Sequence, residues 1–208
     1  MTDFQAYSVV GFDLDNTLFN QEEYEFSIFR EIAKKVEMLY SLEDEVYFNA
    51  LKKLYYSGEK DQTFDKAFLL CQPKLPVNWE ETMADTVLKL YRNYLPETLT
   101  PFSNTITLLQ SLKKRNKKLV LITNGRLKTQ NAKIDILGIR EYFDLVLISD
   151  SYIPVRRKPD TKMFEDSLKY FNIPASSMLY IGDDFVRDKA SENVGVDFVH
   201  IDELIDEA

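Results

Sequence analysis

From Leu99 onward, short apolar runs alternate with stretches whose apolar residues recur at helical spacing, and this alternation restricts the possible folds more than any other feature. Five apolar runs have the length and composition of buried strands: residues 8–13, 119–122, 145–148, 178–181 and 198–201. Four further segments are typical of helices: about 104–114, 127–137, 160–171 and 186–193. This alternation predicts an α/β fold, a Rossmann-like doubly wound parallel sheet with helices on both faces.

A helical block interrupts this pattern after the first run. Between about Gln21 and Tyr94 no segment is typical of a strand, and apolar residues recur three or four positions apart. We expect roughly four helices in this block. The sequence therefore predicts a Rossmann-like core formed by residues 1–19 and 96–208, with a helical domain inserted at residues 20–95.

The composition restricts the possible partners. The chain has 208 residues, enough to bury a core, and 45% of them are hydrophobic, which is typical of a globular protein. Its formal net charge of −8 argues against capture of nucleic acid or of anionic membranes. A small phosphorylated ligand stays possible, because it needs only one local cationic pocket.

The cysteine content and the apolar runs bear on the compartment. Cys71 is the only cysteine, so no internal disulfide can form and a reducing compartment fits best. No apolar run is long enough to span a bilayer, and the start of the chain lacks the pattern of a signal peptide. We therefore expect a cytoplasmic protein with no membrane partner, and the sequence leaves its oligomeric state open.

Polar side chains follow three of the predicted strands, and a lysine precedes the helix expected at 160–171. These residues are Asp13 and Asp15, then Thr123, Asn124 and Gly125, then Lys158, and finally Asp183 and Asp184 with Asp188 behind them. Because parallel strands end at one rim of the sheet, we expect these groups to converge on one crevice. That crevice would hold several carboxylates, one lysine and one hydroxyl group.

Such a group of side chains is suited to phosphoryl chemistry. Clustered carboxylates repel one another unless a cation joins them, and Mg²⁺ is a hard cation that prefers carboxylates, water and a substrate phosphate. A carboxylate can attack phosphorus to form an aspartyl-phosphate. Lys158 and Thr123 would neutralise and hydrogen-bond the phosphoryl oxygens. A second carboxylate, Asp15, could protonate the leaving oxygen and later deprotonate water.

Four segments resemble, in order and spacing, the four motifs of the haloacid dehalogenase-like hydrolase superfamily. They are Asp13-Leu14-Asp15-Asn16-Thr17, Ile122-Thr123-Asn124-Gly125, Lys158-Pro159 and Gly182-Asp183-Asp184-Phe185-Val186-Arg187-Asp188. The resemblance runs from residue 8 to about residue 200. The helical block resembles the small helical cap, of the C1 type, that some members carry after the first motif.

The resemblance implies a role for each matched residue. Asp13 would be the nucleophile and Asp15 the general acid and base, while Thr17 would help to hold the first loop. Phosphate would be bound by these groups: the side chain of Thr123, the backbone amides of Asn124 and Gly125, and Lys158, which would also pair with Asp13.

The resemblance also implies a magnesium site. The ion would be held by the Asp13 side chain, the Asp15 backbone carbonyl and Asp183. Asp188 would lie close behind, as a ligand through water or as a support for the other ligands. The neighbouring Asp184 leaves a choice of register, and Asp183 is favoured because it directly follows the glycine of the motif.

The presence of Asp15 and of both later aspartates favours a phosphatase over a dehalogenase of this superfamily, because a dehalogenase protonates no leaving group and binds no metal. We expect a small phosphorylated metabolite as substrate, with a slight preference for a nucleoside monophosphate. Two alternatives stay open: a phosphomutase of the same superfamily and a non-catalytic phospho-aspartate signalling module. His200, the only histidine, is expected to lie away from the motifs.

Overall fold

The computed structural model describes residues 4–58 and 61–205. The chain divides into two compact units, one made of Met1–Gln21 and Glu97–Ala208 and the other of Glu22–Pro96. Within the described ranges, every helix is too short or too polar to span a membrane.

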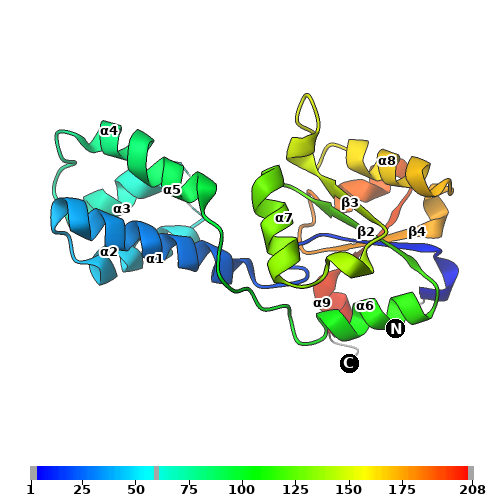
Figure 1. Ribbon diagram of the computed structural model, residues 1–208. Coiled ribbons are helices and arrows are strands. Elements are labelled where there is room, and N and C mark those ends of the chain that lie inside the picture. The colour runs from blue at the N-terminus through cyan, green and yellow to red at the C-terminus, as the bar shows by residue number, and fades with distance from the viewer. Residues whose placement is uncertain (1–3, 59–60, 206–208) are drawn as a thin grey trace. The chain divides into compact units, whose positions relative to one another are not determined.

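The first unit is built on a parallel sheet with strand order β3-β2-β1-β4-β5 (Figure 1). Its strands are β1 (Val9–Phe12), β2 (Lys118–Thr123), β3 (Leu145–Ile148), β4 (Met178–Gly182) and β5 (Asp197–His200). The strand β1 is central, with a neighbour on each edge and side chains buried on both faces, which explains why its sequence is wholly apolar. The predicted α/β fold with a doubly wound parallel sheet is confirmed.

Helices cover both faces of this sheet. The crossover segments are α6 (Thr105–Lys114), α7 (Leu127–Ile136), α8 (Lys162–Phe171) and the 3₁₀ helix η6 (Lys189–Val194). The steps from β1 to β2 and from β2 to β3 run one way across the sheet, and the later steps run the other way. Since parallel crossovers are right-handed, α6 and α7 lie on one face and α8 and η6 on the other (Figure 1).

Two predicted elements differ from the observed ones. The helix expected at 186–193 is a 3₁₀ helix that begins only at Lys189, and it follows a turn in which the Asp184 carboxylate accepts hydrogen bonds from the amides of Val186 and Arg187. The last strand ends at His200, and Ile201 begins the short helix α9 (Ile201–Ile205). Short 3₁₀ turns complete the unit at η1 (Phe4–Ala6), η3 (Arg140–Tyr142), η4 (Ser149–Ser151) and η5 (Ala175–Ser177).

A close-packed core lies between the sheet and α8. Val120 and Ile122 of β2 pack there with Met163 and Phe164 of α8, all of them buried. Gly11 leaves room for this packing, since a Cβ at that position would lie 2.7 Å from the ring of Tyr180.

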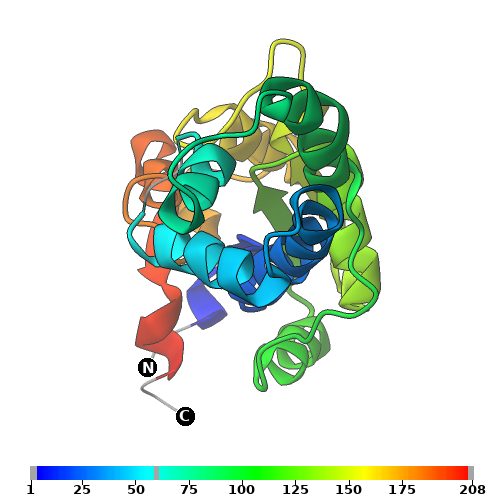
Figure 2. The same cartoon turned by 90° about the vertical axis from the view of Figure 1, so that its left-hand side faces the viewer.

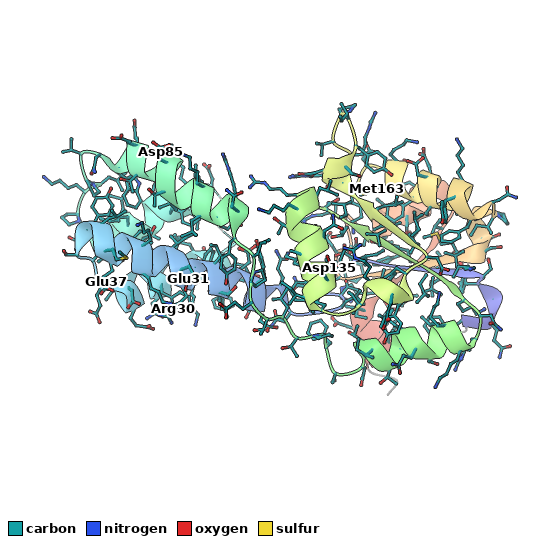
Figure 3. The ribbon with its side chains drawn as sticks, in the orientation of Figure 1. Arg30, Glu31, Glu37, Asp85, Asp135 and Met163 are labelled. Carbon is teal, nitrogen blue, oxygen red and sulfur yellow. The ribbon has the colours of Figure 1, made fainter. Side chains whose placement is uncertain are left out.

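All regular elements of the second unit are helices in the described residues. Its elements are α1 (Gln21–Tyr40), α2 (Asp44–Tyr56), α3 (Thr63–Cys71) and a continuous segment composed of α4 (Trp79–Thr82), the π-helix η2 (Met83–Val87) and α5 (Leu88–Asn93). Figure 2 shows these helices around one interior, which is filled by aromatic and branched side chains such as Ile32, Tyr47 and Trp79. Charged side chains including Arg30, Glu31 and Asp85 lie on its outer surface (Figure 3). The unit therefore has a hydrophobic core of its own.

The two connections between the units leave the sheet unit side by side. Phe19 and Pro101 form an isolated antiparallel bridge. Next to it, the carbonyl of Leu18 accepts a hydrogen bond from the amide of Phe102 and another from the hydroxyl of Thr105, both at 3.0 Å. The chain thus leaves the sheet unit and returns to it at one place.

Candidate active site

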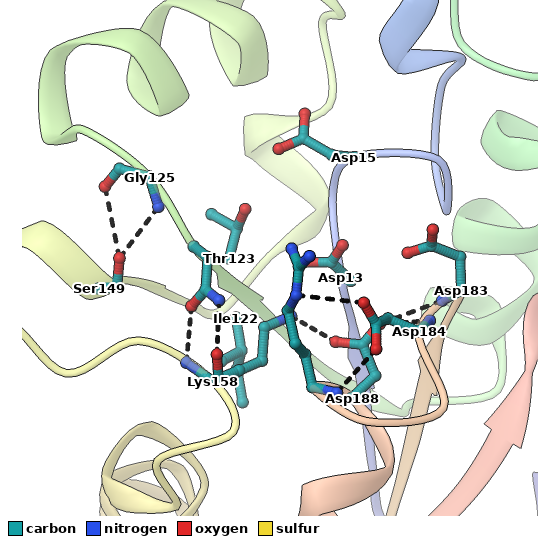
Figure 4. Close-up of polar contacts among 12 residues, drawn as sticks. Asp13, Asp15, Ile122, Thr123, Gly125, Ser149, Lys158, Asp183, Asp184 and Asp188 are labelled. Carbon is teal, nitrogen blue, oxygen red and sulfur yellow. Dashed lines mark hydrogen bonds and ion pairs between the residues drawn. The ribbon is translucent and has the colours of Figure 1, made fainter. Parts of the chain in front are cut away.

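Lys158 lies at the centre of a buried ionic cluster at the carboxyl ends of the strands (Figure 4). Its Nζ atom is 2.7 Å from Oδ1 of Asp13 and 2.5 Å from Oδ1 of Asp188, and it donates to the hydroxyl of Tyr180 at 2.9 Å. The Lys158 side chain is 2% exposed. A buried ammonium with three fixed acceptors has a single position, so Lys158 is held directly against Asp13.

The backbone of Lys158 is held by Asn124. The Asn124 side chain accepts from the Lys158 amide at 2.8 Å and donates to the Lys158 carbonyl at 2.9 Å. The two bonds join the loop after β2 to the segment that carries the lysine. Asn124 was expected to act through its backbone amide, and this role of its side chain was not expected.

Asp188 fixes the loop after β4. One carboxylate oxygen, Oδ2, accepts the backbone amides of Asp183 and Asp184, each at 3.1 Å, while Oδ1 pairs with Lys158. Gly182 permits this arrangement, because a Cβ there would lie 2.2 Å from Oδ2 of Asp188. Asp188 is buried and pairs directly with Lys158, so it is part of the cluster.

Three carboxylates of this cluster could hold a metal ion. One carboxylate oxygen each from Asp13, Asp183 and Asp188 lies within 4.8 Å of the others. Asp184 does not take part: its oxygens accept the amides of Val186 and Arg187 and pair with the Arg187 guanidinium. The geometry therefore places Asp183, and not its neighbour, beside Asp13.

The electrostatics of the cluster show an excess of negative charge. Burial, together with the nearby carboxylates of Asp188 and Asp15, raises the pKa of Asp13 to about 7, although Lys158 opposes the shift. Burial and Asp188 also raise the pKa of Asp183. Burial acts to lower the pKa of Lys158, but Asp13 and Asp188 outweigh it and the pKa is raised. Lys158 therefore stays protonated, and the three carboxylates can accommodate a further cation.

The Asp15 carboxylate is near Asp13 but is directed toward α7. In Figure 4 its carboxyl group points away from Lys158. Both of its oxygens contact α7: Lys133 Nζ lies 2.7 Å from Oδ1, and Gln130 Nε2 donates to Oδ2 at 3.0 Å. The same Gln130 nitrogen donates to the hydroxyl of Thr123 at 2.7 Å. Asp15 and Thr123 are thus joined through Gln130.

Gly125 and Thr17 are the remaining predicted site residues, and they differ in their hydrogen bonding. The amide of Gly125 donates to the Ser149 hydroxyl at 2.9 Å, so it is engaged with the protein itself. Thr17 is buried, and its hydroxyl has no hydrogen-bond partner in the part of the chain that the structure describes. Ser149 was not singled out from the sequence.

The expectation for His200 was wrong. Its ring nitrogen Nε2 lies 2.8 Å from the backbone carbonyl of Asp183, and the ring stacks on Phe185 with a centroid distance of 4.5 Å. His200 therefore adjoins the fourth motif, because β5 is the sheet neighbour of β4 and pairs Gly182 with His200. Neighbouring strands cannot be identified from one sequence, which explains the error.

A comparison with protein families identifies the class. The model of the haloacid dehalogenase-like hydrolase family matches residues 10–201. The chain belongs to this family, as its four motifs indicated. The predicted enzyme class is also confirmed, since relatives that span most of the chain are phosphatases of this family.

Two named relatives and one solved structure illustrate the similarity. A glyceraldehyde 3-phosphate phosphatase of Methanocaldococcus jannaschii is 29% identical over 91% of this chain and 82% of its own length. A pyrimidine 5'-nucleotidase of Escherichia coli is 28% identical over 84% of this chain and 76% of its own. The crystal structure of a HAD phosphatase from Thermococcus onnurineus has a TM-score of 0.63, with 21% identity over 93% of this chain and 85% of that one. The similarity to this solved structure shows the fold alone.

Proposed function

We propose that this protein is a magnesium-dependent phosphatase that hydrolyses a small phosphomonoester through an aspartyl-phosphate intermediate. The observation that carries the proposal is the buried cluster in which Lys158 pairs with Asp13 and Asp188, with Asp183 within ligand distance. A nucleophile, a phosphate-binding cation and an oxygen-only set of metal ligands thereby meet at one point.

The residues present fit a magnesium ion. All three candidate ligands are carboxylates, which a hard divalent cation prefers. Together they carry more negative charge than the positive charge of Lys158 can neutralise. We assign the ion to Asp13, Asp183 and the Asp15 backbone carbonyl, with Asp188 bound through water or supporting the ligand loop. When bound, the ion would lower the repulsion between Asp13 and the incoming phosphate.

In the first step, a carboxylate oxygen of Asp13 attacks phosphorus while the bond from phosphorus to the leaving oxygen breaks. Asp15 gives a proton to that oxygen, which leaves as an alcohol. Lys158 and the Thr123 hydroxyl neutralise and hydrogen-bond the phosphoryl oxygens, and we assign the backbone amide of Asn124 to the same task. The Gly125 amide would join them by exchanging its hydrogen bond to the Ser149 hydroxyl for one to the phosphate.

In the second step, Asp15 takes a proton from water as the water oxygen attacks phosphorus. The bond between phosphorus and the Asp13 oxygen breaks, which regenerates the Asp13 carboxylate and releases inorganic phosphate. Asp15 is then protonated again for the next cycle. Thr17, which is buried and follows both aspartates in the first motif, would support the loop that carries them.

The relatives support a small phosphorylated metabolite as substrate. Their names mention glyceraldehyde 3-phosphate and pyrimidine nucleotides. Among such compounds we propose a nucleoside monophosphate first. We also propose that the core comprises residues 1–19 and 96–208 and that the helical unit at 20–95 acts as a cap, which would exclude water and add contacts to the substrate. The single cysteine supports a cytoplasmic location.

Phosphate release tests the proposal. The enzyme is incubated with 4-nitrophenyl phosphate, with magnesium or with a chelator, and then with nucleotides, sugar phosphates and phosphoglycolate. We expect magnesium-dependent release that Asp13→Asn abolishes, with a nucleoside monophosphate as the best substrate. Release that persists in Asp13→Asn would contradict the nucleophile, and release unaffected by a chelator would contradict the metal.

Two other outcomes would favour the alternatives. Little free phosphate, together with activation by a sugar bisphosphate, would indicate a phosphomutase. A stable acyl phosphate on Asp13 without turnover would indicate a signalling module.

A further inference from the structure

Two side chains of α7 hold the carboxylate of Asp15. Lys133 contacts one oxygen and Gln130 the other, at 2.7 and 3.0 Å. The two residues are three positions apart and therefore project from the same side of the helix. Lys133 is 3% exposed, with its ammonium 5.5 Å from the ring centroid of Phe19. The Lys133 ammonium is therefore buried beside Asp15, with which it pairs when the carboxyl group is ionised.

Gln130 connects Asp15 to the second motif. Its Nε2 group has two hydrogens, and the two acceptors are Oδ2 of Asp15 and the hydroxyl of Thr123. Gly125 leaves the space that this side chain occupies, since a Cβ there would lie 2.8 Å from Cδ of Gln130. The φ angle of Gly125, +149°, also suits a glycine. The glycine, the glutamine and Asp15 thus form one packed arrangement.

We propose that Gln130 and Lys133 are positioning residues that orient Asp15 for proton transfer. The inference rests on the proposed function, in which Asp15 exchanges a proton with the leaving oxygen and then with water. Such an exchange requires hydrogen-bond distance and a defined direction, and a carboxylate held at both oxygens has one orientation. Neither α7 residue needs to touch the substrate, because each acts through Asp15.

The dependence on the leaving group tests this role. Protonation of the leaving oxygen matters most for a poor leaving group, so phenyl phosphate and 2,4-dinitrophenyl phosphate are compared by kcat/KM. This parameter reports phosphoryl transfer to Asp13 and excludes the later hydrolysis. In Lys133→Met we expect kcat/KM for phenyl phosphate to fall about a hundredfold, and that for the dinitrophenyl ester far less. The matched control is Lys128→Met, which removes an exposed lysine from the same helix and should leave both values unchanged.

A double mutant separates positioning from general destabilisation. In Asp15→Asn the leaving group is no longer protonated, so adding Lys133→Met should not change the ratio of the two kcat/KM values further. Lys133→Arg, which keeps the charge, should restore part of the phenyl phosphate activity. A role limited to stability would lower both esters alike and would persist in the Asp15→Asn background.

The inference would be overturned if Lys133→Met left the ratio of the two kcat/KM values unchanged, whether both values stayed the same or both fell alike. The phosphatase activity itself would not be in question. If Lys133→Met does not fold, Gln130→Met is judged by the same ratio, since it removes the donor to the other oxygen of Asp15. Absence of phosphate release from either ester by the unaltered protein would instead overturn the proposed function, and this inference with it.

Discussion

At the scale of single residues, the site places more negative charge in a buried position than its lysine can neutralise. Asp13 and Asp188 both contact Lys158, and Asp183 lies close to them. Isolated buried carboxylates are costly to ionise, which accounts for the raised pKa of Asp13, about 7. The cluster could hold a cation, and without one the repulsion between its carboxylates opposes folding.

The Asp13→Asn variant should therefore be more stable than the parent protein at pH 8 without metal. Because the pKa of Asp13 is raised on folding, the folded protein keeps a proton between about pH 4 and 7 that the unfolded chain has lost. The stability of the parent thus falls as the pH rises through this range, whereas the asparagine does not titrate.

At pH 8 we expect the variant to have a Tm at least about 2–4 °C higher than the parent. This shift corresponds to a gain in the free energy of unfolding on the order of 1 kcal/mol. The difference should shrink toward pH 4. Calorimetry at several pH values with a chelator measures it. The exposed control Asp61→Asn should show no such trend. A variant less stable than the parent at pH 8 would show that Lys158 outweighs the repulsion.

Tyr180→Phe should destabilise the fold. The Tyr180 hydroxyl donates to the carbonyl of Ile122 at 2.8 Å and accepts from Lys158 at 2.9 Å, and the residue is fully buried. Removing the hydroxyl leaves both partners short of a hydrogen bond, at a cost of about 1–3 kcal/mol. Urea unfolding measures the loss, and Tyr170→Phe, at an exposed tyrosine, serves as the control. Equal midpoints for the two variants would contradict the assigned hydrogen bonds.

At the scale of elements, the strand ends were predictable and the helix contacts were not. Asp13, Lys158 and Asp183 do meet, because parallel strands end at one rim and the motifs follow them. The contacts of Gln130 and Lys133 depend on how α7 packs on the sheet, which the motifs do not encode. One signal was available: both residues lie in helical phase with apolar positions 134 and 137, where a buried face would place them.

Two other features were not predicted correctly from the sequence: the start of the helix near residue 186 and the position of His200. The helix expected at 186–193 begins only at Lys189 and is a 3₁₀ helix, preceded by a turn in which the Asp184 carboxylate accepts the amides of Val186 and Arg187. The proximity of His200 to the fourth motif follows from strand order. Strand order depends on tertiary contacts, whereas the apolar runs that predicted the strands are local.

Gly182→Ala should disturb the loop after β4. The added methyl group would lie 2.2 Å from Oδ2 of Asp188, so this carboxylate must move away from the amides it accepts. We expect a loss of about 1–3 kcal/mol in stability and weaker magnesium binding, measured by calorimetric titration. Gly138→Ala is the comparison, because its Cβ would meet open space and only the backbone strain at φ +64° remains. Unchanged magnesium affinity in Gly182→Ala would argue against Asp188 as a support of the metal ligands.

At the scale of the whole molecule, the chain comprises two units with separate cores. The sheet unit is interrupted by the helical unit, yet its two connections lie side by side at Phe19 and Pro101. The bond between Leu18 and Phe102 strengthens that junction. The sheet unit therefore closes on itself without the insertion.

A variant in which Glu22–Pro96 is replaced by a short Gly-Ser linker should fold into the same parallel sheet. The cores on which the sheet depends lie outside the excised segment, and a short linker can span neighbouring chain ends. Circular dichroism and a cooperative thermal transition would verify this. A chain without a cooperative transition would show that the sheet unit needs the helical unit to fold.

The ion pair between Asp13 and Lys158 joins groups 145 positions apart in the chain. Contacts of this span close late in folding, because the entropy of ordering the intervening chain must be overcome before they form. Secondary structure can return within the helices and in local turns while the two charged groups are still apart. During refolding from denaturant, the regain of catalysis would therefore follow the regain of helical signal, and the enzyme would act as a reporter of its own final ordering step.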